Sequence, residues 1–353
     1  MWNPMKIKPL LQRYQALLDL PAHTQSISLL EGGTPLLPLP RLAQELGGGF
    51  ELYAKVEGLN PTGSFKDRGM TAAVGEALGR GAQAVICAST GNTAASAAAY
   101  AARAGLRCIV LIPQGKVAAG KLAGALAYGA QVIQVSGSFD QALELVVQVS
   151  QRQPIALVNS LNPHRLQGQK TAAFEIIEDL GRAPDWLCLP VGNAGNIIAY
   201  WMGFRQVHQL HASGLPLLLG VQAAGAAPLV HGAPVEVPET VATAIRIGKP
   251  ARGEQALQAA AESGGRIVAA SDAEILAAQR RLAAEGLWVE PASAAGLAGL
   301  TAEIAAGRLQ PQGRVVLVCT GHGLKDPDTI TQAIPATPVI PAELAALEAL
   351  LAG

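Results

Sequence analysis

The sequence has few charged and few aromatic side chains for its length. Of its 353 residues, 15% are Asp, Glu, Lys or Arg and 4% are Phe, Trp or Tyr, whereas half are hydrophobic. An ordinary soluble domain carries roughly 25% charged residues. A chain this apolar can bury a large core, which argues against intrinsic disorder. At roughly 150 residues per domain, the length suggests about two domains.

The chain also lacks a net charge. Lys plus Arg and Asp plus Glu number 26 each, so no net field attracts nucleic acid or an anionic membrane surface. The longest apolar stretches are rich in Ala and Gly and contain charges; Arg103 and Arg107 interrupt residues 94–112. A membrane-spanning helix needs roughly 20 mainly apolar residues. We therefore expect no nucleic-acid partner and no membrane partner.

Cysteine is scarce and scattered. The four cysteines, Cys87, Cys108, Cys188 and Cys319, form no CxxC pair and have no metal-ligand spacing. Three of them lie in the strand-like runs AVIC, RCIVLI and VVLVC, where buried, inert thiols are the favoured interpretation. The sequence therefore predicts no bound metal, and free thiols fit a reducing cytoplasm.

The beginning of the chain does not resemble a secretory signal. Apolar side chains recur there at helical spacing among polar residues, at Leu10, Leu11, Tyr14, Leu17 and Leu18. This pattern predicts an amphipathic helix that docks on the rest of the protein. It agrees with a cytoplasmic location.

Short apolar runs alternate with longer Ala-rich segments. Predicted strands cover residues 52–56, 84–88, 108–112, 131–135, 155–158, 186–190, 217–221, 266–269 and 314–320. Predicted helices cover residues 67–79, 94–104, 116–128, 139–151, 168–180, 197–210, 272–284 and 292–306. This alternation predicts an α/β fold of βαβ units with mostly parallel sheets. The strands are continuously apolar, as in sheets that helices cover on both faces. A last amphipathic helix is expected after the Pro-rich segment 334–341.

Lys66 is the first candidate for chemistry. It lies in the segment NPTGSFKDRG (60–69), where Thr62 or Ser64 can cap the helix that follows. The positive end of the helix dipole and burial would both lower the pKa of this lysine. The neutral amine is the form that condenses with an aldehyde cofactor. An ordinary surface lysine is the alternative interpretation.

Three loops after predicted strands are rich in Gly, Asn, Ser and Thr. They are ASTGNT (88–93), GNAGN (192–196) and TGHGLKDP (320–327). Ligands of open α/β sheets lie beyond the carboxyl ends of strands, and a loop that opens a helix offers free N–H groups to an anion. The alternative for each loop is a plain helix cap or tight turn, which we favour for the side chains of His322 and Lys325. Without a Walker lysine or a GxGxxG motif, a small phosphate monoester fits better than a nucleotide.

The segment around Lys66 and these three loops, in this order, resemble those of threonine synthases, which belong to the tryptophan-synthase-β-like (fold type II) pyridoxal-phosphate enzymes. The resemblance extends to EGGTPL (31–36), KVEGLNPTGSFKDRGM (55–70), NSLNP (159–163), GQKTAAFE (168–175), TAIRIG (243–248) and EPASAAG (290–296). It covers about residues 12–328 and is specific to the activity rather than only to the fold. Gln167 departs from the pattern, because we expect Glu there; this puts a local ion pair in doubt but not the chemistry.

The resemblance implies a fold, a reaction and an assembly. It implies two α/β domains, each with a mostly parallel sheet flanked by helices. Residues 50–157 would form a smaller, mobile domain with the cofactor lysine, and residues 1–49 and 158–353 a larger one with the loop for the cofactor phosphate. The implied enzyme is a lyase that uses pyridoxal 5'-phosphate to convert O-phospho-L-homoserine into L-threonine and phosphate, the last step of threonine biosynthesis. A homodimer is also implied.

The resemblance also implies roles for individual residues. Lys66 would be the catalytic residue and would carry the cofactor covalently. The other cofactor-binding residues would be Asn92 at the phenolic oxygen, Thr320 at the pyridine nitrogen, and Gly192, Asn193, Ala194, Gly195 and Asn196 at the phosphate. The substrate carboxylate would be bound by Ser89, Thr90, Asn92 and Thr93. The substrate phosphate would be bound by Ser160 and Arg165, and a guanidinium suits a phosphate dianion because it forms paired hydrogen bonds.

Two other functions remain as alternatives. A serine or threonine dehydratase or a cysteine synthase would share the lysine and the glycine-rich loops, although SFKDRGM, GNAGN and TGHGLKDP together match threonine synthases better. A non-catalytic ligand-binding protein could have kept the fold, but the intact Lys66 and Asn92 argue against it.

Overall fold

Two parallel-dominated sheets organise the molecule. The computed structural model describes residues 8–115, 119–137, 139–331 and 337–351. One sheet has the strand order β1-β2-β10-β7-β8-β9, and the other has the order β5-β4-β3-β6. Every pairing is parallel except that of β1 with β2. The six-stranded sheet contains β1 (Leu36–Pro38), β2 (Phe50–Val56), β7 (Trp186–Pro190), β8 (Leu217–Ala223), β9 (Arg266–Ala270) and β10 (Gly313–Cys319). The four-stranded sheet contains β3 (Ala84–Ala88), β4 (Arg107–Pro113), β5 (Gln131–Val135) and β6 (Ile155–Leu157).

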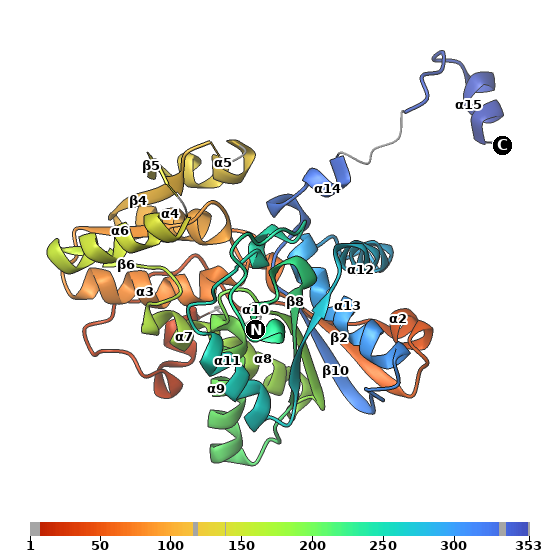
Figure 1. Ribbon diagram of the computed structural model, residues 1–353, viewed down its shortest axis with the longest axis horizontal. Coiled ribbons are helices and arrows are strands. Elements are labelled where there is room, and N and C mark those ends of the chain that lie inside the picture. Colours follow the sequence, from red (N-terminus) through yellow and green to blue (C-terminus); the bar gives the residue numbers. More distant parts are fainter. Residues whose placement is uncertain (1–7, 116–118, 138, 332–336, 352–353) are drawn as a thin grey trace, which may run out of the picture.

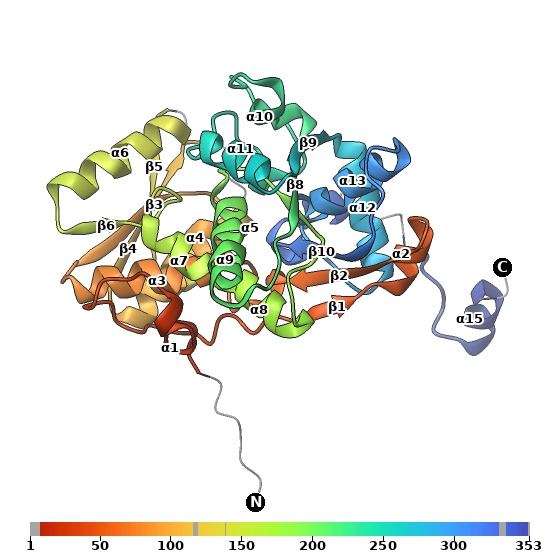
Figure 2. The same cartoon turned by 90° about the horizontal axis from the view of Figure 1, so that it is seen from below.

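Helices cover both faces of both sheets (Figures 1 and 2). The four-stranded sheet has α4 and α6 in contact with its strands, and α3 packs beside α4. The six-stranded sheet has α12 and α13 in the apolar core on one face, and α8, α9 and α11 in the core on the other. The helices are α1 (Leu10–Arg13), α2 (Pro40–Glu45), α3 (Lys66–Gly79), α4 (Asn92–Ala104), α5 (Ala119–Ala127), α6 (Phe139–Arg152), α7 (Pro163–Gln169), α8 (Thr171–Leu180), α9 (Gly195–His211), α10 (Pro228–His231), α11 (Gly253–Glu262), α12 (Asp272–Ala284), α13 (Pro291–Ala305), α14 (Asp328–Thr331) and α15 (Leu344–Leu351).

The predicted α/β fold is confirmed, and all nine predicted strands are present with shifts of one or two residues at their ends. The sequence pattern missed β1 and the helices α2, α10, α11 and α14. β1 has only three residues, which is too short for a periodic pattern, and it forms by antiparallel pairing with β2. The predicted helix 168–180 is two helices, because α7 ends at Gln169 and α8 begins at Thr171. Residues 116–118 of another predicted helix lie outside the described residues.

The N-terminal segment docks as expected. Leu10 and Tyr14 are buried in one small core with Phe174 and Val207, and the rings of Tyr14 and Phe174 meet edge to face at 5.3 Å. The helix itself is short, since α1 ends at Arg13 and a 3-10 turn follows. The expected last helix is α15, which has no buried residue and stands apart from the body in both views. In the described part of the chain, no helix is long and apolar enough to span a membrane.

The four-stranded sheet begins later in the chain than the domain boundary that we expected at residue 50. The four-stranded sheet is built from residues 84–157, whereas β2 pairs with β1 and β10 in the six-stranded sheet. The chain enters the four-stranded unit through α3, which begins shortly after β2. Assignment of residues 50–157 to a separate, mobile domain therefore remains a proposal, with β2 hydrogen-bonded to the other sheet.

Glycines let α3 and α7 approach closely. A Cβ on Gly168 would lie 1.8 Å from the carbonyl oxygen of Arg68, and one on Gly69 would lie 2.9 Å from the carbonyl oxygen of Arg165. Both clashes are with backbone atoms, which cannot rotate away as a side chain does. The contact fixes the start of α3, which carries Lys66, against the helix that carries Arg165.

We predict that Gly168→Ala destabilises the protein by at least about 1–3 kcal/mol, the usual cost of overpacking a close contact. Chemical denaturation measures this free energy of unfolding. Gly124→Ala is the matched control, because its new Cβ would lie at an ordinary 3.5 Å from the Cβ of Ala95. Alanine is also favoured over glycine within a helix. Equal stability of the two variants would contradict the close packing of α3 and α7.

Candidate functional site

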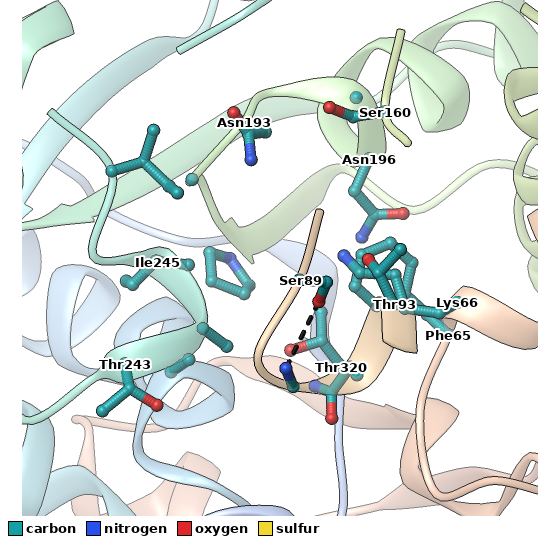
Figure 3. Close-up of a pocket in the computed structure, with 18 of the residues that line it drawn as sticks. Phe65, Lys66, Ser89, Thr93, Ser160, Asn193, Asn196, Thr243, Ile245 and Thr320 are labelled. Carbon is teal, nitrogen blue, oxygen red and sulfur yellow. Dashed lines mark hydrogen bonds between the residues drawn. The ribbon is translucent and has the colours of Figure 1, made fainter. Parts of the chain in front are cut away.

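A cavity of about 440 Å³ lies where elements of both sheets meet. Its walls come from the start of α3 and from the loops after β3, β6, β7 and β10, which agrees with the expectation that ligands lie beyond strand ends. Every residue that the sequence suggested for the site lines it, and several of them are labelled in Figure 3. These residues are Lys66, Ser89, Thr90, Asn92, Thr93, Ser160, Arg165, Gly192, Asn193, Ala194, Gly195, Asn196 and Thr320. Their binding roles remain predictions.

Lys66 is the first residue of α3, but the expected cap on this helix is wrong. The helix has no side-chain cap. Instead, Thr62 donates its N–H and its hydroxyl, both at 2.6 Å, to the carboxylate of Asp67 in the first turn. The Ser64 hydroxyl is buried and has no partner in the described residues. The turn before Lys66 is thus held by an acid within the helix rather than by a capping hydroxyl.

The pKa of Lys66 is lowered, as expected. Burial and the nearby Arg165 guanidinium lower it to about 7, against the opposing effect of Glu290. The Nζ atom lies 3.8 Å from the centre of the Phe65 ring, an apolar neighbour that solvates an ammonium group less well than water does. A large fraction of this amine is therefore neutral, and able to act as a nucleophile, near neutral pH.

Glu290 is a site residue to which the sequence interpretation gave no role. It precedes the first residue of α13, lines the cavity, and is only 3% exposed. Asn92, at the start of α4, donates its side-chain amide to both carboxylate oxygens, at 3.1 and 3.0 Å. The signal that could have found Glu290 is an acidic residue directly before a Pro-initiated, Ala-rich helix within a motif that we had already singled out.

The loop 192–196 presents free donors to the cavity. Ala194 has a left-handed backbone (φ 68°) just before α9, a conformation that costs energy for a residue other than glycine. In the described part of the chain, the N–H groups of residues 192–196 donate to no protein acceptor, and the buried amide nitrogen of Asn196 has no partner. Several unsatisfied donors at a helix N-terminus suit an anion such as phosphate.

Thr320 follows β10 and lines the cavity, and a hydrogen bond fixes the position of its hydroxyl. Its hydroxyl lies 2.8 Å from the hydroxyl of Ser293, which in turn accepts the N–H of Gly321 at 2.8 Å. Ser293 is a second residue that the sequence interpretation left without a role. It stands in the same EPASAAG motif as Glu290. The hydroxyl of Thr320 is therefore held by a neighbour rather than free to rotate.

Arg165 is a buried cation without an ionic partner among the described residues. It is 2% exposed, donates one Nη1 hydrogen bond to the Val158 carbonyl at 3.2 Å, and its Nε has no partner. Burial lowers the pKa of Arg165 to about 10. A buried charge is costly unless it is paired, so this guanidinium is suited to an anionic ligand in the cavity.

The loop that carries Ser160 is held from two sides. The side chain of Asn159 donates to and accepts from the backbone of Ala88, each at 2.9 Å. Arg252 donates to the carbonyl oxygens of Ser160 and Leu161, at 3.1 and 3.0 Å. The loops after β3 and β6 are therefore tied together on one side of the cavity.

His322 and Lys325, for which we favoured a structural role, lie differently relative to the cavity. His322 does not line the cavity; its Nδ1 accepts the N–H of Leu324 at 3.1 Å, as in a turn. Lys325 does line it, and burial lowers the pKa of Lys325. The doubted ion pair at Gln167 is replaced by a neutral contact, since its side-chain oxygen accepts the N–H of Asp19 at 3.0 Å.

Comparison with known proteins agrees with this geometry. Residues 27–321 match the model of a family described as pyridoxal-phosphate dependent enzymes. Threonine synthase of Halalkalibacterium halodurans is 54% identical over 332 residues, covering 94% of this chain and 93% of its own. That of Mycobacterium bovis is 58% identical, covering 90% and 88%, and that of Methanocaldococcus jannaschii is 51% identical, covering 91% and 82%.

Solved structures of lower identity share the fold. A maize serine racemase is 20% identical with a TM-score of 0.74, covering 93% of this chain and 95% of its own. The processed form of a threonine deaminase from Solanum lycopersicum is 22% identical with a TM-score of 0.70, covering 85% and 82%. The family match and the identities above 50% show the relationship directly. The chain therefore belongs to the threonine synthase family of pyridoxal-phosphate-dependent enzymes.

Proposed function

We propose that this lyase converts O-phospho-L-homoserine and water into L-threonine and phosphate, with pyridoxal phosphate attached at Lys66. The observation that carries the proposal is that one cavity holds a lysine with a pKa of about 7 and, separately, a buried guanidinium without an ionic partner among the described residues. The lysine suits the cofactor, and the guanidinium suits a second anion. The relatives named threonine synthase support the same reaction.

The residues of the cavity fit the cofactor. Free N–H groups of residues 192–196 and the unpaired amide nitrogen of Asn196 suit its phosphate, and the braced hydroxyl of Thr320 suits its ring nitrogen. When bound, pyridoxal phosphate supplies an aldehyde that couples to amines and a ring that withdraws electrons from the substrate. Lys66 and Asn92, which line the same cavity, would then face the aldehyde end of the ring.

The substrate brings two anionic groups to opposite ends of a short chain. Its carboxylate suits the hydroxyls of Ser89, Thr90 and Thr93 at the N-terminus of α4, where unpaired N–H groups and the helix dipole favour a negative charge. Its phosphate suits Arg165, which can offer its remaining N–H donors, with Ser160 beside it. Binding at both ends would hold the reacting carbons next to Lys66.

Lys66 then moves the protons. Its neutral Nζ is able to take a proton from Cα and next from Cβ, because its pKa of about 7 suits a general base near neutral pH. Phosphate leaves from Cγ, which gains a proton, and the hydroxyl of a water molecule adds at Cβ. Return of a proton to Cα completes L-threonine, so that substrate and water together balance threonine and phosphate.

We predict that Lys66→Ala abolishes the yellow visible absorbance band and lowers phosphate release from O-phospho-L-homoserine by at least about a hundredfold. The band is lost because the variant has no amine for covalent attachment. Borohydride reduction, digestion and mass spectrometry should place the pyridoxyl group on the Lys66 peptide of the wild type. Lys249→Ala, at an exposed lysine, should keep both properties. A label on another peptide, or oxo-acid formation from serine or threonine without phosphate release, would overturn the proposal.

We predict that Arg165→Gln raises the KM for O-phospho-L-homoserine about 10- to 100-fold, as expected for the loss of hydrogen bonds to a charged group. L-Threonine has the same carboxylate and amine but no phosphate, so the change in absorbance that it causes on binding should need the same concentration as in the wild type. If the variant binds threonine as poorly as it binds the substrate, Arg165 has a structural role instead.

We further infer that the unit containing residues 50–157 closes over the bound substrate, in a cytoplasmic homodimer. Closure would exclude water that could release intermediates too early. Support comes from the cavity itself, whose walls are shared between the two sheets. Crystals with and without a substrate analogue should show the four-stranded sheet in different positions relative to the other sheet. Superimposable sheets in the two crystals would refute closure.

A further inference from the structure

Glu290 is a buried acid in the cavity that the proposed reaction does not yet use. Its N–H donates to the Gly321 carbonyl at 3.1 Å, directly before Pro291 starts α13. The side chain thus projects from a fixed backbone position into the cavity that also contains Lys66 and Asn92.

The packing around Glu290 leaves room for the carboxyl group and little more. A Cβ on Gly321 would lie 2.4 Å from Oε1 and 2.6 Å from Cδ of Glu290. Any other residue at position 321 would therefore push the carboxyl group out of its place. Gly321 of the TGHG segment therefore makes room for this acid.

The carboxylate determines which way the amide of Asn92 faces. When it is ionised, the Glu290 carboxylate has only acceptors, and the amide nitrogen of Asn92 faces it at 3.1 and 3.0 Å. A single N–H shared between the two carboxylate oxygens can serve this contact, which would leave the second N–H for a ligand. The side-chain oxygen of Asn92 makes no hydrogen bond with the described residues, and Asn92 lines the cavity.

The charges that face Glu290 come from two elements. Lys66 is on α3, and Lys325 and Asp326 are in the turn after β10. Burial raises the pKa of Glu290 to about 7; the hydrogen bonds from Asn92 and the charges of Lys66 and Lys325 oppose this rise, and the charge of Asp326 adds to it. On Lys66 the effect is reciprocal: Glu290 favours the ammonium form, whereas Arg165 disfavours it.

We infer that Glu290 is a positioning residue: its carboxylate orients the Asn92 amide toward the cofactor, and its negative charge favours the protonated form of the Lys66 amine, against the effects of burial and Arg165. The inference rests on the proposed function, because Asn92 acts on the cofactor only if Lys66 carries it. Glu290 would act on the reaction only through Asn92 and Lys66.

The charge effect is tested on Lys66 itself. The full-length chain is stripped of cofactor, shown to regain its visible band when pyridoxal phosphate is added, and acylated at a series of pH values. Mass spectrometry of the Lys66 peptide gives the pKa of this amine. Glu290→Gln removes the negative charge and should lower the pKa of Lys66 by about one unit or more, the size that a nearby opposite charge produces. Arg165→Gln removes the positive charge and should raise it.

Two further variants separate charge from structure. Glu290→Asp keeps the charge, so Lys66 should titrate close to the wild-type value. Glu254→Gln removes an exposed acid in the first turn of α11 and should change nothing. An unchanged pKa of Lys66 in Glu290→Gln, or an equal shift in Glu290→Asp, would refute the counter-charge role. Thermal melting identifies unfolded variants. If Glu290→Gln does not fold, Glu290→Ala takes its place, because it also removes the charge.

The orientation effect is tested by a double-mutant cycle on cofactor affinity. Glu290→Gln and Asn92→Ala should each weaken binding of pyridoxal phosphate, measured from the visible band, and the double variant should be no weaker than Asn92→Ala alone. Additive losses would show that Glu290 does not act through Asn92. If the wild type itself forms no band, the proposed function fails, whereas the acylation experiment still measures the effect of Glu290 on Lys66.

Discussion

The geometry of the cavity depends on a buried ion network around Arg68, two residues after Lys66. Arg68 is 1% exposed and contacts Glu57 at 2.7 Å and Glu175 at 2.6 Å. Lys55 reaches the same Glu175 at 3.0 Å. Burial would raise the pKa of Glu175, but Arg68 and Lys55 hold it well below its usual value. Two cations and two acids satisfy one another, because a buried charge left alone is strongly destabilising. The network joins β2, the start of α3 and α8, so it fixes Lys66 relative to the six-stranded sheet.

Two buried arginines near the start of α3 differ in their ionic partners. Arg68 has two acidic partners, whereas Arg165, on the helix that the Gly168 contact holds against α3, has none among the described residues. Both guanidiniums are buried, so their difference is not one of exposure. An arginine with paired acids holds the structure together, whereas an arginine without them keeps its charge for a ligand. This contrast explains why we assign Arg165, and not Arg68, to the substrate phosphate.

The sequence predicted what depends on local pattern, and missed what depends on distant contacts. Continuous apolar runs and Gly-rich loops located the strands and the cavity walls, because strand ends and helix starts meet at one edge of a parallel sheet. The expected cap at Thr62 or Ser64 was wrong because Asp67, five residues after Thr62, accepts the N–H and the hydroxyl of Thr62. Glu290 received no role because its partner Asn92 lies 198 residues away. No local spacing reveals such a pair.

The fold alone does not decide the reaction, since a serine racemase and a threonine deaminase share it at 20% and 22% identity. A lysine of lowered pKa and a phosphate-binding loop are requirements of the cofactor, and any reaction on it needs them. What selects one reaction is the part of the cavity that the cofactor leaves free. In the arrangement that we propose, that part has the Arg165 guanidinium, which lacks an ionic partner among the described residues and lies beside a loop that Asn159 and Arg252 hold in place. A substrate with a second anion satisfies this charge, whereas serine or threonine would leave it buried and unpaired. The cost of that unpaired charge therefore favours a phosphorylated substrate over the smaller amino acids.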